Sequence, residues 1–157
     1  AELGMLDVNI IAMHMLMKLF LPDLEAKDRG YILNVASSAA FLPGPLLSSY
    51  YASKAYVLRL SEAVAEELRR AGSGVRISVL CPGPVQTEFD QVANVCFSAP
   101  SLSSRRVAEC AVNGMFRGKP VIVPGARMKA VRLAQRLVPD RLLARICWHV
   151  QRKKSGT

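Results

Sequence analysis

Three side chains in this chain have the types and spacing of an acid–base site: Ser37, Tyr50 and Lys54. On a helix, residues i and i+4 lie on one face, so the ammonium of Lys54 would lie near the phenol of Tyr50. A free phenol titrates near ~10, and a nearby cation lowers that value, so we expect Lys54 to lower the pKa of Tyr50. Ser37 ends an apolar, strand-like run, and its hydroxyl could hold a substrate oxygen. The trio predicts proton transfer to or from a carbonyl oxygen, provided that something supplies the hydride.

A Tyr-x-x-x-Lys pair is not specific by itself. Many helices contain one by chance, and the alternative is a partly buried tyrosine beside a solvated lysine. The elements around the pair therefore decide its meaning.

Helical and strand-like patterns alternate along the chain. Helical apolar spacing predicts a helix over 2–20, with Pro22 just past its end, and another over 50–71 that stops at Gly72. Apolar, β-branched runs predict buried strands, and a Pro/Gly/Ser-rich loop separates the first strand from the second long helix. The remaining predicted elements are strands over 30–37, 75–81 and 120–124, a loop over 38–49 and a helix over 104–117. This order predicts an α/β fold with parallel strands joined by right-handed crossovers.

The charge is concentrated at one end of the chain. The 157 residues carry a formal net charge of +9, and 51% of them are apolar, as in a globular domain. Residues 1–125 hold 12 basic and 11 acidic side chains, whereas residues 126–157 hold 9 basic and 1 acidic. The basicity belongs to the tail, so we do not expect a nucleic-acid-binding body.

Cysteine and histidine usage points away from a metal centre. The four cysteines show no paired spacing, and only His14 and His149 could assist them, so no metal site is expected. Reduced thiols in the cytoplasm are the simplest interpretation. Asp7, Asn9, His14 and Lys18 interrupt the apolar first twenty residues, which argues against a membrane span or a signal peptide.

Four local patterns occur together in a fixed order. They are Asp7-Val8-Asn9, Asn34-Val35-Ala36-Ser37, Tyr50-x-x-x-Lys54 and Pro82-Gly83-Pro84-Val85-Gln86-Thr87. With them, residues 1 to about 125 resemble the C-terminal part of short-chain dehydrogenases/reductases, NAD(P)-dependent oxidoreductases with a Rossmann fold. The resemblance implies the C-terminal half of a doubly wound parallel sheet with about three strands. Residues 126–157 would be a basic helical extension.

The resemblance assigns catalytic roles. Tyr50 would give or take the carbonyl proton, and Lys54 would tune Tyr50 and hold the nicotinamide ribose. Ser37 would orient and polarise the substrate oxygen, with Ser38 as the adjacent alternative. Asn9 would hold a water in the proton relay; a helical asparagine bonded to backbone is the other interpretation.

The resemblance also assigns cofactor contacts and a lid. Pro82, Gly83, Val85 and Thr87 would form the loop over the nicotinamide amide, where glycine lets the backbone approach closely. Without the other motifs, Pro-Gly-Pro would be an ordinary turn after a strand. Residues 91–103 would form a substrate lid. NADP(H) is favoured and NAD(H) is the alternative, with a small lipophilic ketone or alcohol as substrate.

The glycine-rich phosphate loop of the family does not occur in this sequence. In a complete member, roughly a hundred residues that carry this loop would precede Ala1. We therefore expect the 157-residue chain to be a poor enzyme alone, because the cofactor would lack its anchor. We also expect the strand at 31–37 to have an unpaired edge. The resemblance implies homo-oligomers through the helices at 2–20 and 50–71, and an assembly module is the alternative function.

The tail has a pattern of its own. From 126 to 150, arginines recur among apolar residues, with a break at Pro139, so two short basic amphipathic helices are expected. Packing against the domain, where they would shade the substrate entrance, is the favoured interpretation. Contact of residues 126–154 with a membrane surface or an acidic partner is the alternative, and it would make a cytoplasmic protein membrane-associated.

Overall fold

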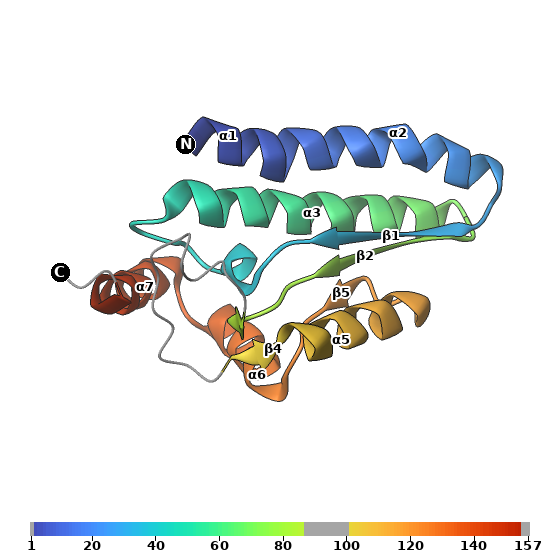
Figure 1. Cartoon of the computed structure of the whole chain (residues 1–157). Helices are drawn as coiled ribbons and strands as arrows, with labels where there is room; N and C mark the ends of the chain where they lie inside the picture. Colours follow the sequence, from blue (N-terminus) through green and yellow to red (C-terminus); the bar gives the residue numbers. More distant parts are fainter. Residues whose placement is uncertain (1, 87–100, 155–157) are drawn as a thin grey trace.

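A parallel sheet lies between two layers of helices (Figure 1). The computed structural model describes residues 2–86 and 101–154. One layer contains α1 (Glu2–Leu6), the π-helix η1 (Asp7–Ala12), α2 (Met13–Ala26) and α3 (Ser48–Arg70). The other layer contains α5 (Ser104–Phe116). This arrangement is the predicted α/β fold, part of a doubly wound sheet.

The sheet has the strand order β1–β2–β5. β1 (Gly30–Val35) pairs in parallel with β2 (Val75–Leu80), from Gly30 opposite Val75 to Val35 opposite Leu80. β5 (Val121–Ile122) pairs in parallel with the end of β2. About three strands were predicted, and all three lie near the predicted positions. Each ends one or two residues earlier than predicted, and β5 also starts one residue later.

The core follows the two faces of β2. Val75 and Ile77 pack with Met17 and Leu68 of the overlying helices. Leu80, on the opposite face, packs with Val107, Ala111 and Ile122. Because side chains alternate across a strand, this central strand is buried on both faces and reads as nearly continuous apolar sequence.

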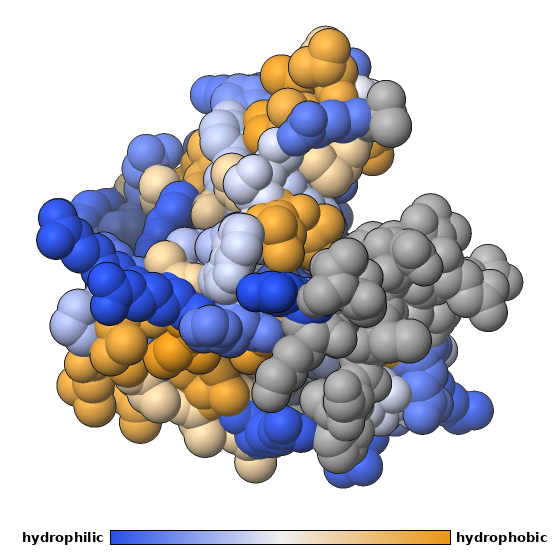
Figure 2. Space-filling model, turned by 90° about the vertical axis from the view of Figure 1, so that its left-hand side faces the viewer, coloured by the Kyte–Doolittle hydropathy of each residue, from blue (hydrophilic) through white to orange (hydrophobic). Residues whose placement is uncertain are grey.

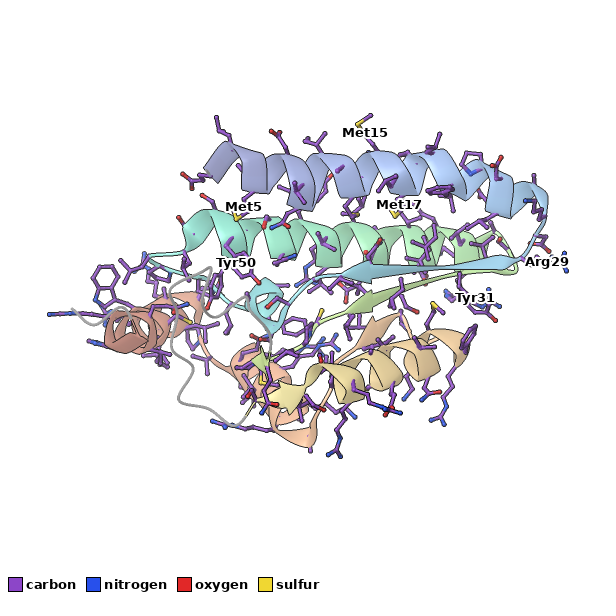
Figure 3. The ribbon with its side chains drawn as sticks, viewed as in Figure 1. Met5, Met15, Met17, Arg29, Tyr31 and Tyr50 are labelled. Carbon is purple, nitrogen blue, oxygen red and sulfur yellow. The ribbon has the colours of Figure 1, made fainter. Side chains whose placement is uncertain are left out.

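The first helix extends past its predicted end. It reaches Ala26, with Pro22 inside α2, so placing Pro22 beyond the helix was wrong. Proline removes a backbone donor from a helix, but Leu21 and Leu24 on either side of Pro22 pack on the core beneath and hold this turn in place. Met17 points toward the body of the domain and Met15 away from it (Figure 3).

The helix Glu2–Ala26 is long and apolar enough to cross a membrane, by length and composition. Core helices of soluble proteins pass the same test. Here one side of the helix packs on β1 and α3 through Met17 and its neighbours.

Three short elements, η2, β3 and β4, were not predicted. The 3-10 helix η2 (Ser38–Phe41) occupies the start of the predicted loop. β3 (Val85–Gln86) pairs in parallel with β4 (Leu102–Ser103) as a separate two-stranded ribbon, so the last two residues of the predicted lid are a strand. The greater part of that lid lies outside the described residues.

The tail forms helices on both sides of Pro139, as predicted. They are α6 (Ala126–Ala134), which continues into the 3-10 turn η3 (Gln135–Leu137), and α7 (Asp140–Lys154). Met128 of α6 packs against the buried cluster that contains Leu58 and Val79. Cys147 and Gln151 of α7 are buried. The tail therefore packs on the domain along one side.

Leu58 offers a direct test of this packing. Its side chain is 1% exposed in the cluster between α3 and the sheet. Leu58→Ala should lower the free energy of unfolding by about 2–5 kcal/mol, because lost contacts and a residual cavity both contribute. Denaturant unfolding of the chain measures this loss.

Leu137→Ala is the matched control. Leu137 is 85% exposed, so this change should alter stability by no more than about 0.5 kcal/mol. Equal losses for both variants would contradict the described core.

Candidate active site

The site lies where β1 and β2 end at the same edge of the sheet. The two strands finish in register, and the pairing continues past them through the Ala36 amide to the Leu80 carbonyl at 2.8 Å. The Ser38 amide then donates to the Pro82 carbonyl at 2.7 Å. These bonds place the segment around Ser37 beside the Pro82–Val85 loop. Ligands of open α/β sheets bind at this kind of edge.

Ser37 and Tyr50 meet across this edge. Ser37 precedes η2, and its hydroxyl accepts a hydrogen bond from the Ala39 amide at 3.1 Å, which fixes the side chain. Tyr50, in the first turn of α3, forms a side-chain hydrogen bond with Ser37. Figure 3 shows Tyr50 on the side of α3 that faces the rest of the domain. Of the two adjacent serines, Ser37 is therefore the one bonded to the tyrosine.

Lys54 lies one turn beyond Tyr50 on α3. Its ammonium is 5.8 Å from the centroid of the Tyr50 ring, as the i, i+4 spacing predicts. It makes two long hydrogen bonds, to the Val35 carbonyl at 3.4 Å and to Asn9 Oδ1 at 3.5 Å. Among the described residues, no carboxylate forms an ion pair with Lys54. Its donors therefore remain available to a ligand hydroxyl.

The electrostatics differ from the sequence prediction. Burial raises the pKa of Tyr50, and the hydrogen bond with Ser37 offsets only part of that rise. Burial also lowers the pKa of Lys54. The predicted lowering of the Tyr50 pKa by Lys54 was wrong for this structure: removal of the phenol from water is the largest cause of the shift, and the opposing cause is the hydrogen bond with Ser37. Because its pKa lies above that of a free phenol, Tyr50 is protonated at neutral pH.

Asn9 reaches the site from the π-helix η1. Its side chain lies between Lys54 and Ser53, with the amide nitrogen donating to Ser53 Oγ at 3.1 Å. Ser53 is fully buried and donates to the Tyr50 carbonyl at 2.7 Å. π-Helical turns occur often at functional sites, since the extra residue redirects a side chain. Asn9 thus bonds side chains of α3 rather than its own backbone.

Ser53 is a site residue that the sequence analysis missed. It holds both Asn9 and the first turn of α3. The sequence feature that could have identified Ser53 is its place three positions after Tyr50, as a small polar residue on the face that α3 packs against the core.

The loop predicted to lie over the nicotinamide amide is described only as far as Gln86. Pro82, Gly83 and Val85 follow β2 at the same sheet edge, while Thr87 lies outside the described residues. A Cβ atom on Gly83 would lie 2.7 Å from Met128 Cγ. The close approach that glycine permits here is thus made by the chain's own α6.

Tyr51, next to the catalytic candidate, links the site to the tail. Its hydroxyl accepts a hydrogen bond from the buried Gln151 side chain of α7, and its ring packs against Gly44. The rings of Tyr50 and Tyr51 meet edge to face, with centroids 6.0 Å apart. Tyr51 thus packs against a helix that lies a hundred residues further along the chain.

A groove opens beside the unpaired edge of β1. It has a volume of about 610 Å³ and extends from the site along the gap between α2 and β1. Asn9, Val35 and Lys54 line its site end, and apolar side chains that include Phe20 and Tyr31 line the rest. Among the described strands, none pairs with this edge, as predicted.

The comparisons with known proteins agree with this geometry. A family model described as short chain dehydrogenase matches residues 4–95. The chain belongs to the short-chain dehydrogenase family.

Particular relatives match most of the chain. Estradiol 17-beta-dehydrogenase 11 of Mus musculus is 31% identical over 138 residues, which cover 87% of this chain and 46% of that protein. The chain therefore spans about half the length of the curated relatives it matches.

Solved structures match over a similar span. A Burkholderia cenocepacia short chain dehydrogenase in complex with NADP is 30% identical, with a TM-score of 0.73 over 90% of this chain and 56% of that one. A Burkholderia phymatum short chain dehydrogenase/reductase in complex with NAD shares the fold at 24% identity, with a TM-score of 0.71 over 81% of this chain and 54% of that one.

The hydrogen bond between Ser37 and Tyr50 can be tested by titration. Ser37→Ala should raise the pKa of Tyr50 further, because this bond is the interaction that lowers it. Phenol absorbance against pH, with the Tyr50→Phe curve subtracted, isolates this one tyrosine.

Ser38→Ala is the matched control and should leave the Tyr50 pKa unchanged. An unchanged or lower Tyr50 pKa in Ser37→Ala would contradict the described contact.

Proposed function

We propose that these residues form the proton-transfer half of an NAD(P)-dependent carbonyl reductase site. The observation that carries the proposal is the hydrogen-bonded cluster of Ser37, Tyr50, Lys54 and Asn9 at the carboxyl edge of a parallel sheet. Bound nicotinamide cofactor would supply the hydride to the carbonyl carbon.

Each residue has a role that its contacts support. In the reduction, the protonated Tyr50 donates its proton to the carbonyl oxygen. Ser37 donates a hydrogen bond to the same oxygen and holds it beside Tyr50. Lys54 carries positive charge next to Tyr50 and stabilises the tyrosinate that the transfer leaves. Asn9 holds the Lys54 ammonium in place.

The donor set fits the nicotinamide end of a dinucleotide. Within the described structure, no carboxylate pairs with the Lys54 ammonium, so its N–H groups can donate hydrogen bonds to a ligand. The two ribose hydroxyls of the cofactor can accept such bonds. Pro82, Gly83, Val85 and Thr87 would face the nicotinamide amide. NADP(H) is the preferred cofactor: the NADP-bound structural relative is more similar in sequence than the NAD-bound one. NAD(H) stays the alternative.

The proposed substrate is a small lipophilic ketone or secondary alcohol. The name of the mouse relative refers to a steroid alcohol, which supports a substrate of this chemical kind. We propose that the 157-residue chain alone reduces such ketones poorly, because it contains no phosphate-binding glycine loop.

A chimera tests the proposed chemistry. The chain is joined to the dinucleotide-binding half of the Burkholderia cenocepacia relative, and NADPH-dependent reduction of lipophilic ketones is measured. Tyr50→Phe should lower kcat by about 100- to 10,000-fold while NADPH still binds, since only the proton donor is lost. Tyr56→Phe, on the same helix but bonded to His14, should keep nearly full activity. An active chimera that is unaffected by Tyr50→Phe would rule out the assigned role.

A second function, assembly, has one observation in its favour. The outer face of α1, η1 and α2 exposes large apolar side chains, including Ile11, Met15 and Leu19. We propose that copies of the chain pair through this face and α3, in the homo-oligomer expected from the family resemblance.

Light scattering tests the pairing. The double variant Ile11→Glu/Leu19→Glu should be monomeric at concentrations where the parent chain is a dimer or larger, because two buried charges per subunit would oppose association. Val112→Glu on α5 is the control. Unchanged association in the double variant would exclude this face.

A further inference from the structure

We propose that the outer face of α7 binds the surface of an anionic lipid bilayer. This face is not part of the site described above, and the inference does not depend on the proposed reaction.

The inner face of α7 fixes how the helix is turned. Cys147 and Gln151 are buried, and Gln151 is bonded to Tyr51 on α3. At 100° per residue, Arg145 and His149 then lie on the opposite side of the helix, with Leu142 between His149 and Ile146 around its circumference. The helix is therefore held against the domain with a defined outward surface.

Two stripes run along that outward surface. Leu142, Ile146 and Val150 follow one another every four residues, and each is nearly half exposed, at 49%, 46% and 47%. Arg141, Arg145 and Arg152 form the second stripe, on the neighbouring flank of the helix, and all three are exposed. Figure 2 faces the end of the molecule where α7 lies, and there hydrophobic residues gather directly below a row of strongly hydrophilic ones.

The positive charge of the tail indicates which kind of partner this face of α7 binds. Residues 126–157 carry 9 basic and 1 acidic side chains. Among the described residues, no acidic side chain forms an ion pair with the three arginines of the second stripe. A second copy of this face would bring like charges together in a symmetric pairing. A plane of lipid phosphates above acyl chains matches a basic stripe beside an apolar one.

The segment before α7 adds exposed apolar surface. Leu137, at 85%, is the most exposed of the large hydrophobic residues in the described structure, and it stands three positions before α7 begins. Long arginine side chains can reach the headgroups while their stems cover apolar surface. The helix would thus lie in the plane of the interface without crossing it.

Trp148 reports the binding directly. It is the only tryptophan of the chain, lies on α7 and is partly exposed. The full chain is titrated with phosphatidylcholine vesicles and with mixed phosphatidylcholine–phosphatidylserine vesicles. We expect saturable change in Trp148 emission and co-flotation with the mixed vesicles only.

Paired variants on α7 and α5 distinguish the effect of the two stripes from a general effect of charge or apolar surface on binding. Arg141→Gln/Arg145→Gln should weaken binding by about 30-fold, whereas Arg106→Gln/Arg117→Gln, on α5 and at the residue after its end, should leave it nearly unchanged. Ile146→Glu should weaken binding by about tenfold or more, whereas Val112→Glu, at a similar exposure of 43%, should not. Circular dichroism confirms that each variant is folded.

Three results would overturn the proposal. The first is equal binding to neutral and anionic vesicles. The second is equal loss in the α7 and α5 variants. The third is a Trp148 response that depends on protein concentration and not on lipid, which would mean that this face contacts another copy of the chain.

Discussion

The parallel pairing of β1 with β2 is the constraint on which the site depends. Six consecutive residue pairs end in register at Val35 and Leu80, and two further backbone bonds carry the alignment into the loops. A slip of one residue would turn each side chain of a strand to the other face of the sheet. The same slip would separate Ser37 from Tyr50, which α3 holds above the strand end. The burial of β2 thus fixes the relative positions of Ser37 and Tyr50, although neither residue belongs to that strand.

Burial of the site shifts the pKa values of Tyr50 and Lys54 in opposite directions. It raises the pKa of Tyr50 and lowers that of Lys54, so both groups move toward their neutral forms. For the tyrosine, the hydrogen bond with Ser37 opposes this change. The balance keeps Tyr50 a proton donor with a cation nearby to stabilise the charge that donation leaves. Tyr51 and Gln151 connect this balance to α7, whose outer face carries a separate function in our proposal.

The sequence predicted the fold well because periodicity and order carry that information. The alternating elements, the three strands and the break at Pro139 were all readable from local patterns. The end of α2 was not, since tertiary packing around Pro22 overrides the local cost of proline. The β3–β4 ribbon escaped detection because two-residue strands have no period to detect.

The site was predicted by residue type but not by its electrostatics. Tyr50, Lys54, Ser37 and Asn9 lie close together, and their catalytic roles stay a prediction. The sign of the Tyr50 pKa shift depends on how deeply α3 buries the phenol, which no spacing rule states. Ser53 and Gln151 were missed for a related reason: each makes a contact across the fold, and a single polar residue in a helix gives no pattern.

Reduced nicotinamide mononucleotide tests the central claim most directly. If this chain forms only the nicotinamide–ribose end of the site, the mononucleotide should bind the 157-residue chain as tightly as NADPH does, and Lys54→Ala should abolish binding of both. The change in nicotinamide fluorescence measures both affinities. NADPH binding that is tighter by about tenfold or more, or binding that survives Lys54→Ala, would contradict the account.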